Sequence, residues 1–218
     1  TINAPFSRVR ISIDQVLSAI KPNQRMVGGA ITEEIRDEVE KRGLKIDDYL
    51  KREEMAIYNA VPTAEGAVQL AMEELPVTIN GANCLITGYG RIGRMLSRLL
   101  VALGANVTVA ARKFSDLAWA DSHGCRSVEL AKLSQAGDFD VIFNTVPFPI
   151  FNHDVLSKLD KNTLLIDLAS RPGGVEFNAA AELQIKTIWA LSLPGRVAPK
   201  TAGQIIKNTI LNMLKEAM

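Results

Sequence analysis

GYGRIG, at residues 88–93, places three glycines between an apolar segment and an amphipathic one. The preceding NCLIT (83–87) has the apolar character of a buried strand. The segment that follows has an apolar stripe at helical spacing, formed by Ile92, Met95, Leu96, Leu99, Leu100 and Leu103. A helix that starts at a glycine turn presents free N–H groups and the positive end of its dipole. The stretch therefore predicts a phosphate-binding turn at the start of a βαβ unit.

The segments on either side of this turn extend the same pattern. Apolar strand candidates alternate with helical segments, which predicts a parallel sheet with right-handed crossovers and a doubly wound α/β fold. These strand candidates are NVTVAA (106–111), CRSV (125–128), DVIFNTVP (140–147), TLLIDLAS (163–170) and KTIWAL (186–191). We therefore expect a Rossmann domain over residues 77–198.

The remaining residues predict a partial second domain and two joining helices. Residues 1–60 contain strand candidates at 25–31 and 44–50 around a helix at 32–43, a fragment too small to bury a core of its own. We interpret them as the remainder of an N-terminal catalytic α/β domain whose upstream part is missing. Residues 61–76 are predicted to form a connecting helix starting at Pro62, and 199–218 a long C-terminal helix that packs back on the domain junction.

Composition and charge narrow the possible partners. The 218 residues are 47% hydrophobic and 22% charged, as expected for a soluble globular protein, and 25 basic residues nearly balance 24 acidic ones. This balance gives no reason to expect nucleic acid or a membrane as partner. Cys84 and Cys125 are typical of buried thiols in a cytoplasmic protein. The apolar stripe of the C-terminal helix suggests an interface with another domain or with a second copy, so we expect a homo-oligomer.

The glycine spacing matches a dinucleotide site. Gly88 permits the tight turn, Gly90 lets the backbone approach a pyrophosphate, and Gly93 lets helix and strand pack closely. An Asp or Glu at the end of the next strand would bind the ribose of NAD, whereas an Arg nearby would bind the 2′-phosphate of NADP. Arg112 and Lys113 occupy that place, so we favour NADP and keep NAD as an alternative. The predicted cofactor-binding residues are Gly88, Tyr89, Gly90, Arg91, Ile92, Gly93, Arg112, Lys113, Ser115, Asn144, Thr145, Val146 and Pro147.

Two arginines lie in the later loops at the carboxyl edge, where ligands of such sheets bind. Arg171 follows one strand in SRPGG (170–174), and Arg196 follows the next in LPGR (193–196). A guanidinium pairs bidentately with a carboxylate, so both are candidates for binding an anionic substrate, with surface ion pairing as the alternative. Thr63 and Glu65 are weaker candidates, since polar residues at a helix start are commonly caps. The two histidines, His123 and His153, lack partners at metal spacing, so no metal site is expected.

Five longer segments resemble the family of dipicolinate synthase A subunits. They are AIYNAVPTAEGAVQLAMEE, GYGRIGRMLSRLLVALGANVTVAAR, FNTVP, LLIDLASRPGGVEF and LPGRVAPKTAGQII, in this order over almost the whole chain. The resemblance implies a Rossmann domain beside a catalytic domain, and oxidation of dihydrodipicolinate to pyridine-2,6-dicarboxylate with NADP as hydride acceptor. It also implies partnership with a flavoprotein-like B subunit and a place in the mother-cell cytoplasm during sporulation. Family members carry a further N-terminal αβ region, which we do not expect in this chain.

Two other functions are compatible with these residues. One is a different NADP-dependent dehydrogenase of a small carboxylate, of the hydroxyacid or shikimate type. The other is a cofactor-binding subunit that supports a partner and performs no chemistry itself. The sequence leaves the catalytic acid or base, the stereochemistry and the oligomeric state undetermined.

Overall fold

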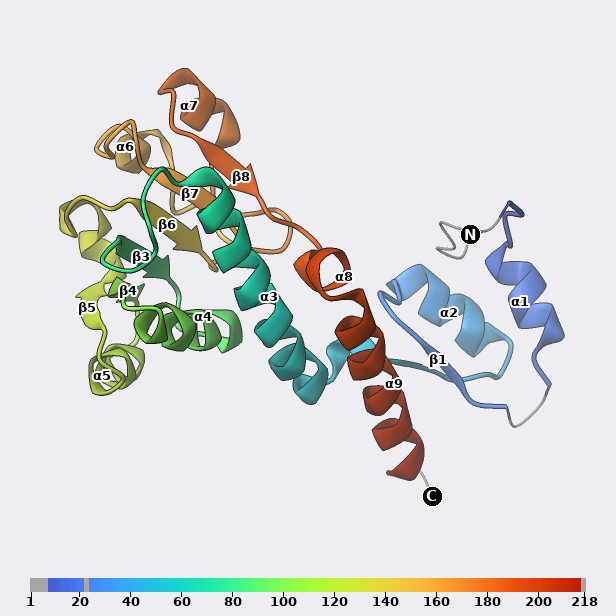
Figure 1. Ribbon diagram of the computed structural model, residues 1–218. Coiled ribbons are helices and arrows are strands. Elements are labelled where there is room, and N and C mark those ends of the chain that lie inside the picture. The colour runs from blue at the N-terminus through green and yellow to red at the C-terminus, as the bar shows by residue number, and fades with distance from the viewer. Residues whose placement is uncertain (1–7, 22–23, 217–218) are drawn as a thin grey trace. The chain divides into compact units, whose positions relative to one another are not determined.

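The structure, a computed structural model, describes residues 8–21 and 24–216 (Figure 1). The chain forms two compact units, one comprising residues 1–56 with 206–218 and the other residues 57–205. The boundaries between the units fall inside two long helices, α3 (Glu53–Glu74) and α9 (Pro199–Lys215).

The second unit is built on a six-stranded sheet in which every strand pairing is parallel. The strand order is β5-β4-β3-β6-β7-β8, with successive strands running outward in both directions from the centre. The strands are β3 (Asn83–Thr87), β4 (Asn106–Ala111), β5 (Arg126–Glu129), β6 (Val141–Asn144), β7 (Leu164–Asp167) and β8 (Thr187–Trp189). The reversal between β3 and β6 is the switch point of a doubly wound Rossmann fold, so the predicted fold class is confirmed.

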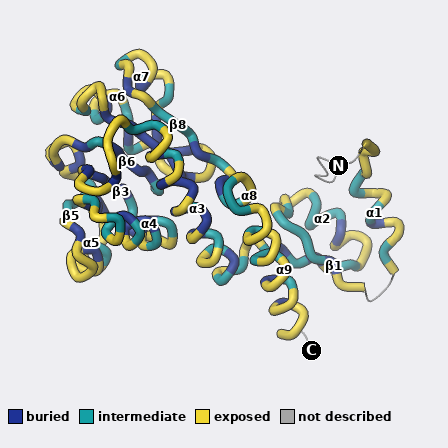
Figure 2. The backbone as a smooth tube through the Cα atoms, viewed as in Figure 1, coloured by how far each residue is buried: buried dark blue, intermediate teal, exposed yellow. Residues whose placement is uncertain are grey.

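Helices cover both faces of this sheet (Figure 1). One apolar core joins the strands to α3, α4 (Arg91–Ala102), α5 (Phe114–Ser122) and the short α8 (Leu193–Val197). The second core lies on the other face, under η2 (Leu130–Gln135), α6 (His153–Leu156) and α7 (Phe177–Glu182). Figure 2 shows that the strands are the most buried part of this unit, as expected for a sheet covered on both sides.

The first unit contains a small parallel pair of strands. β1 (Met26–Gly28) pairs with β2 (Ile46–Asp48), and α2 (Glu33–Lys41) connects them. Thr32 caps α2, because its hydroxyl accepts a hydrogen bond from the Ile35 N–H. This unit also holds α1 (Ile13–Ala19) and η1 (Tyr49–Lys51). Its core is formed by Leu17, Met26, Val39 and Ile46.

Three local predictions were wrong. The connecting helix begins at Glu53, not at Pro62. Pro62 removes one N–H donor, but the helical turns continue on both sides of it, so the proline lies inside the helix and does not start it. Thr63 is therefore no cap, and its hydroxyl donates instead to the Asn59 carbonyl oxygen at 2.7 Å. Helix α1, capped by Ser12 and Gln15, was missed because its seven residues bury a single side chain. Residues 193–197 were expected to be a loop but form α8.

Both cysteines are buried and free. Burial raises the pKa of the Cys84 thiol from its ordinary value of 9.0 to about 12, with the charge of Asp140 adding to the shift. A thiol whose pKa is raised on folding contributes stability below pH 9, and this stability is lost as the pH rises toward 12.

We therefore expect the free energy of unfolding to fall above pH 9, with a contribution from Cys84 of up to about 1.4 kcal/mol per pH unit. Chemical denaturation at a series of pH values, compared between the unaltered chain and Cys84→Ala, measures this contribution. In Cys84→Ala, the cavity should lower the free energy of unfolding by the same amount at every pH. Above pH 9, this free energy should fall less steeply with pH than in the unaltered chain. Equal slopes would contradict the expectation.

Candidate functional site

The glycine turn lies at the carboxyl end of the central strand β3. Gly88 adopts a φ of 87°, which favours glycine, and its N–H donates to the Ala110 carbonyl oxygen of β4 at 2.8 Å. A Cβ at Gly93 would lie 2.3 Å from the Gly88 carbonyl oxygen, so helix α4 approaches the strand as closely as a glycine allows. A Cβ at Gly90, by contrast, would meet nothing within 4 Å. The turn is thus packed at its two outer glycines and open at the middle one, as a pyrophosphate site requires.

The Tyr89 side chain does not line this opening. It is buried, and its hydroxyl lies 2.9 Å from His123 Nδ1. Arg94 lies over the Tyr89 ring, donates from Nε to the Tyr89 carbonyl oxygen at 3.1 Å, and pairs with Asp116 at 3.3 Å. Burial raises the pKa of Tyr89. The Tyr89 ring therefore holds the turn against α5, and only its backbone is left for a ligand.

Arg112 follows directly on β4 and is exposed. Within residues 8–21 and 24–216 its guanidinium has no hydrogen-bond or ion-pair partner, and Asp116, the first carboxylate after it in the sequence, is already paired with Arg94. Arg112 lines a cavity of about 380 Å³ at the carboxyl edge of the sheet. The other lining residues are largely apolar: Leu130, Ala131, Leu133, Ser134, Pro149, Ile150, Asn152 and Val155. An unpaired cation thus stands beside an apolar cavity one strand from the glycine turn.

The other residues predicted near the cofactor differ in how far they are buried. Lys113 and Ser115 are exposed at the start of α5, Arg91 is exposed in the first turn of α4, and Ile92 packs against the core.

The Thr145 hydroxyl donates to the Thr87 carbonyl oxygen at 2.8 Å, and a Cβ on Gly88 would lie 2.5 Å from that hydroxyl. Val146 is half-buried beside the turn and Pro147 is exposed.

Asn144 is fully buried, and its side chain joins the ends of three strands. Its Oδ1 accepts from the Thr87 hydroxyl at 2.7 Å and from the Val146 N–H at 3.1 Å. Its Nδ2 donates to Asp167 Oδ1 at 2.7 Å and to the Val146 carbonyl oxygen at 3.0 Å. All hydrogen-bonding positions of the amide are used, so the side chain has no capacity left for a ligand.

Asp167, which the sequence analysis did not single out, completes this network. It is fully buried at the end of β7. Its carboxylate accepts from Asn144, from the Ala169 N–H at 3.0 Å and from the Gly174 N–H at 2.9 Å. The last two bonds fix both ends of the loop that carries Arg171. An acidic residue ending an otherwise apolar strand is the signal that identifies such a position.

The two arginines predicted to bind substrate follow neighbouring strands. Arg171 is exposed in the loop after β7, and its guanidinium carbon lies 5.7 Å from the centre of the Trp189 ring. Arg196 is exposed in the last turn of α8, after β8. Because β7 and β8 pair in parallel, both arginines follow the carboxyl ends of adjacent strands.

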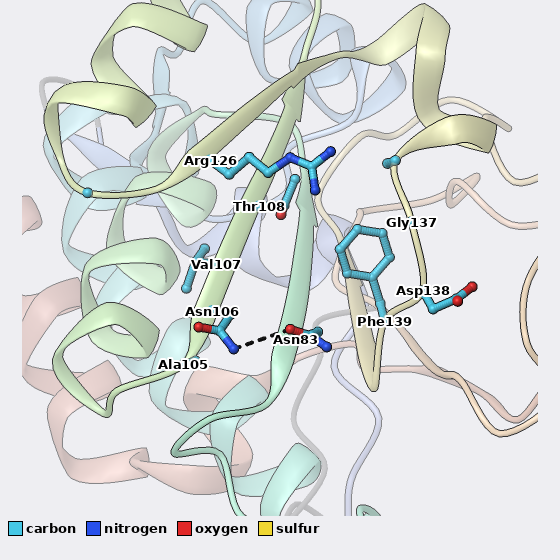
Figure 3. Close-up of a pocket in the computed structure, with 11 residues that line it drawn as sticks. Asn83, Ala105, Asn106, Val107, Thr108, Arg126, Gly137, Asp138 and Phe139 are labelled. Atoms are coloured by element: carbon cyan, nitrogen blue, oxygen red, sulfur yellow. Dashed lines mark hydrogen bonds between the residues drawn. The ribbon is translucent and has the colours of Figure 1, made fainter.

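A larger cavity, of about 460 Å³, lies at the opposite edge, around the amino ends of β3, β4 and β5 (Figure 3). Arg126 extends beside Thr108 there, and Asn106 Nδ2 donates to Asn83 Oδ1 at 3.2 Å. Ligands of open α/β sheets bind at the carboxyl ends of the strands, so we place the candidate site at the glycine turn. Within the described residues no group of three or more His, Cys, Asp or Glu is arranged to hold a metal ion. None of the helices in this part of the chain has the length and apolar character needed to cross a membrane.

The fold and the turn define a nicotinamide-dinucleotide-binding domain, and comparison with known proteins agrees. Residues 51–187 match the family described as D-isomer specific 2-hydroxyacid dehydrogenase, NAD binding domain. Within that class, the chain belongs to the family of dipicolinate synthase A subunits, as its relatives show.

The A subunit of dipicolinate synthase from Bacillus subtilis (strain 168) is 40% identical over 191 residues, which are 87% of this chain and 63% of that protein. The crystal structure of the same B. subtilis protein has a TM-score of 0.87 at 37% identity, covering 95% of this chain and 70% of that one. The crystal structure of the A subunit from Bacillus halodurans has a TM-score of 0.88 at 34% identity, covering 94% and 71%. The sequence match thus spans less than two thirds of the full length of the curated B. subtilis protein.

Proposed function

We propose that this chain binds NADP at the carboxyl edge of its Rossmann sheet and acts in the oxidation of dihydrodipicolinate to pyridine-2,6-dicarboxylate. The observation that carries the cofactor assignment is the combination of an open Gly90 with a Gly93 that admits no side chain. The pyrophosphate would lie against Gly90 and the first-turn N–H groups of α4, a helix of 12 residues.

The cavity beside Arg112 supports NADP over NAD. Its apolar lining is suited to an adenine ring, and Arg112 at its edge is suited to the 2′-phosphate of the attached ribose. Lys113 adds a second exposed cation, and Arg94 neutralises the nearby Asp116. β4 itself carries no carboxylate at its end, where one would accept hydrogen bonds from an unphosphorylated ribose. Glu129, the partner of Ala111 on β5, is paired with Lys132.

The substrate assignment rests on the family and on the two exposed arginines. Two cationic contacts would suit a dicarboxylate, and Arg171 and Arg196 follow adjacent strands on the cofactor's edge of the sheet. When bound, the nicotinamide would accept a hydride, and the oxidation also releases one proton. Because the product is aromatic, the protein's main task is to hold the ring in the right orientation. Assembly with the B subunit, homo-oligomerisation and the mother-cell compartment are part of the same proposal.

The cofactor is tested with Arg112→Ala. We expect the unaltered chain to bind NADP more tightly than NAD in a calorimetric titration. The variant should lose about tenfold to a hundredfold in NADP affinity, because a charge-assisted bidentate contact is lost, while NAD affinity changes little. Arg126→Ala removes an exposed cation at the opposite edge and serves as the control. Tighter binding of NAD than NADP by the unaltered chain would contradict the assignment.

The reaction is tested by mixing the chain with NADP and freshly prepared dihydrodipicolinate, with and without the B subunit. Formation of NADPH, followed at its absorbance, supports the proposed reaction. Tight NADP binding with turnover only in the presence of the B subunit would indicate a protein that depends on its partner for catalysis. Turnover of a hydroxyacid in place of dihydrodipicolinate would identify the other class of dehydrogenase.

A further inference from the structure

Buried hydrogen bonds hold the loop that carries Arg171. Asp167 binds the N–H groups of Ala169 and Gly174, so the loop is fixed at both ends. A Cβ on Gly174 would lie 2.1 Å from Asn144 Nδ2, and one on Gly173 would lie 3.0 Å from Asp167 Oδ2. The loop therefore packs against the buried network without room for side chains at these two positions.

Trp189 contacts the same loop at Ala169 and at Gly173. Its Nε1 donates to the Ala169 carbonyl oxygen at 3.1 Å, and its ring stacks on Phe177 with a centroid distance of 5.2 Å. A Cβ on Gly173 would lie 3.3 Å from Cζ2 of the indole. The ring is thus held by a hydrogen bond, by a second aromatic ring and by the loop backbone, so its orientation is defined by the fold.

The guanidinium of Arg171 lies over this ring, with its carbon 5.7 Å from the ring centre. Arg171 is exposed, and within the described residues it has no hydrogen-bond or ion-pair partner. A cation over an aromatic face is attracted by the ring's quadrupole, and this contact leaves the in-plane N–H groups of a guanidinium free. Those N–H groups are the ones that bind a carboxylate bidentately.

We propose that Trp189 is a positioning residue that holds the Arg171 guanidinium ready to receive a carboxylate of the substrate. This inference rests on the proposed function and adds to it a residue that does not itself bind the substrate. An arginine side chain free in water samples many rotamers, and binding would have to restrict them. The ring of Trp189 restricts Arg171 in advance, so less conformational entropy is lost when the carboxylate binds.

The test is a double-mutant cycle on the full chain, saturated with NADP and titrated with pyridine-2,6-dicarboxylate as the probe. Arg171→Ala should weaken binding by about tenfold to a hundredfold. Trp189→Leu should weaken it by about threefold to thirtyfold, the range of cation–π contacts, and Trp189→Phe, which keeps an aromatic face, by less. The double variant Arg171→Ala with Trp189→Leu should bind no more weakly than Arg171→Ala alone, because Trp189 acts through Arg171.

Two further measurements separate positioning from a merely structural role. NADP affinity should be nearly unchanged in Trp189→Phe, although its melting temperature should fall because the buried Ala169 carbonyl oxygen loses its hydrogen bond. Trp119→Leu, at an exposed tryptophan on α5, should leave binding of the dicarboxylate unchanged. Added guanidinium ion should partly restore binding to Arg171→Ala but not to the double variant, which lacks the aromatic face.

The role of Trp189 would be overturned if the losses in affinity of Arg171→Ala and Trp189→Leu added up in the double variant. It would also be overturned if guanidinium ion restored binding equally to Arg171→Ala and to the double variant. Neither result would overturn the proposed function. If the unaltered chain bound NADP but not pyridine-2,6-dicarboxylate, the proposed substrate would be wrong, and the role of Trp189 would be overturned with it.

Discussion

Gly93→Ala should lose both fold stability and dinucleotide binding. The new Cβ would lie 2.3 Å from the Gly88 carbonyl oxygen and 3.1 Å from its carbonyl carbon, and both are backbone atoms of the turn. Helix α4 must therefore move away from β3 or the turn must open, and either change disrupts the core around the fully buried Leu96 and Leu100. We expect a loss of about 1–3 kcal/mol in the free energy of unfolding, as for other overpacked core positions. Urea denaturation measures this loss.

Gly90→Ala is the matched control for that variant. Gly90 has a φ of −80°, which alanine readily adopts, and its Cβ would meet no protein atom within 4 Å. Stability should therefore change by less than about 0.5 kcal/mol. Affinity for NADP should nevertheless fall by about tenfold or more, because the methyl group would take the space of the pyrophosphate. Unchanged NADP affinity in Gly90→Ala would place the dinucleotide elsewhere.

Asp167→Asn should destabilise the chain by about 2–4 kcal/mol, although the two side chains have nearly the same shape. The carboxylate accepts three hydrogen bonds, and an amide supplies one oxygen and two N–H donors in its place. At least one buried N–H group would then face another donor, and a buried donor without an acceptor costs about 1–3 kcal/mol. The measurement is the midpoint and slope of urea denaturation.

Asp138→Asn provides the comparison, because Asp138 is exposed and should change stability by less than about 0.5 kcal/mol. Hydrogen exchange at the Ala169 and Gly174 amides gives a second readout, since both should exchange faster in Asp167→Asn. If the two variants were equally stable and these amides stayed protected, the network would not hold the loop.

Much of the fold could be predicted because its signals are local. Strand and helix periodicities, and the glycines at 88, 90 and 93, depend on residues close together in sequence, and they identified all six strands of the sheet. The short helices α1 and α8 were missed because a helix of five or seven residues shows too little periodicity. The start of α3 was misplaced because Pro62 resembles a helix start when its surroundings are unknown.

The candidate site divides in the same way. The sequence by itself determined the chemical types at the carboxyl edge: a glycine turn for phosphate, Arg112 where an acid commonly stands, and two later arginines. Tertiary structure decided which side chains are free to bind. It buried Tyr89 and Asn144, which the sequence placed among cofactor contacts, and it set Arg171 over Trp189, 18 positions away. The physical reason is that a side chain's availability depends on hydrogen-bond partners supplied by other strands, and no local pattern specifies those partners.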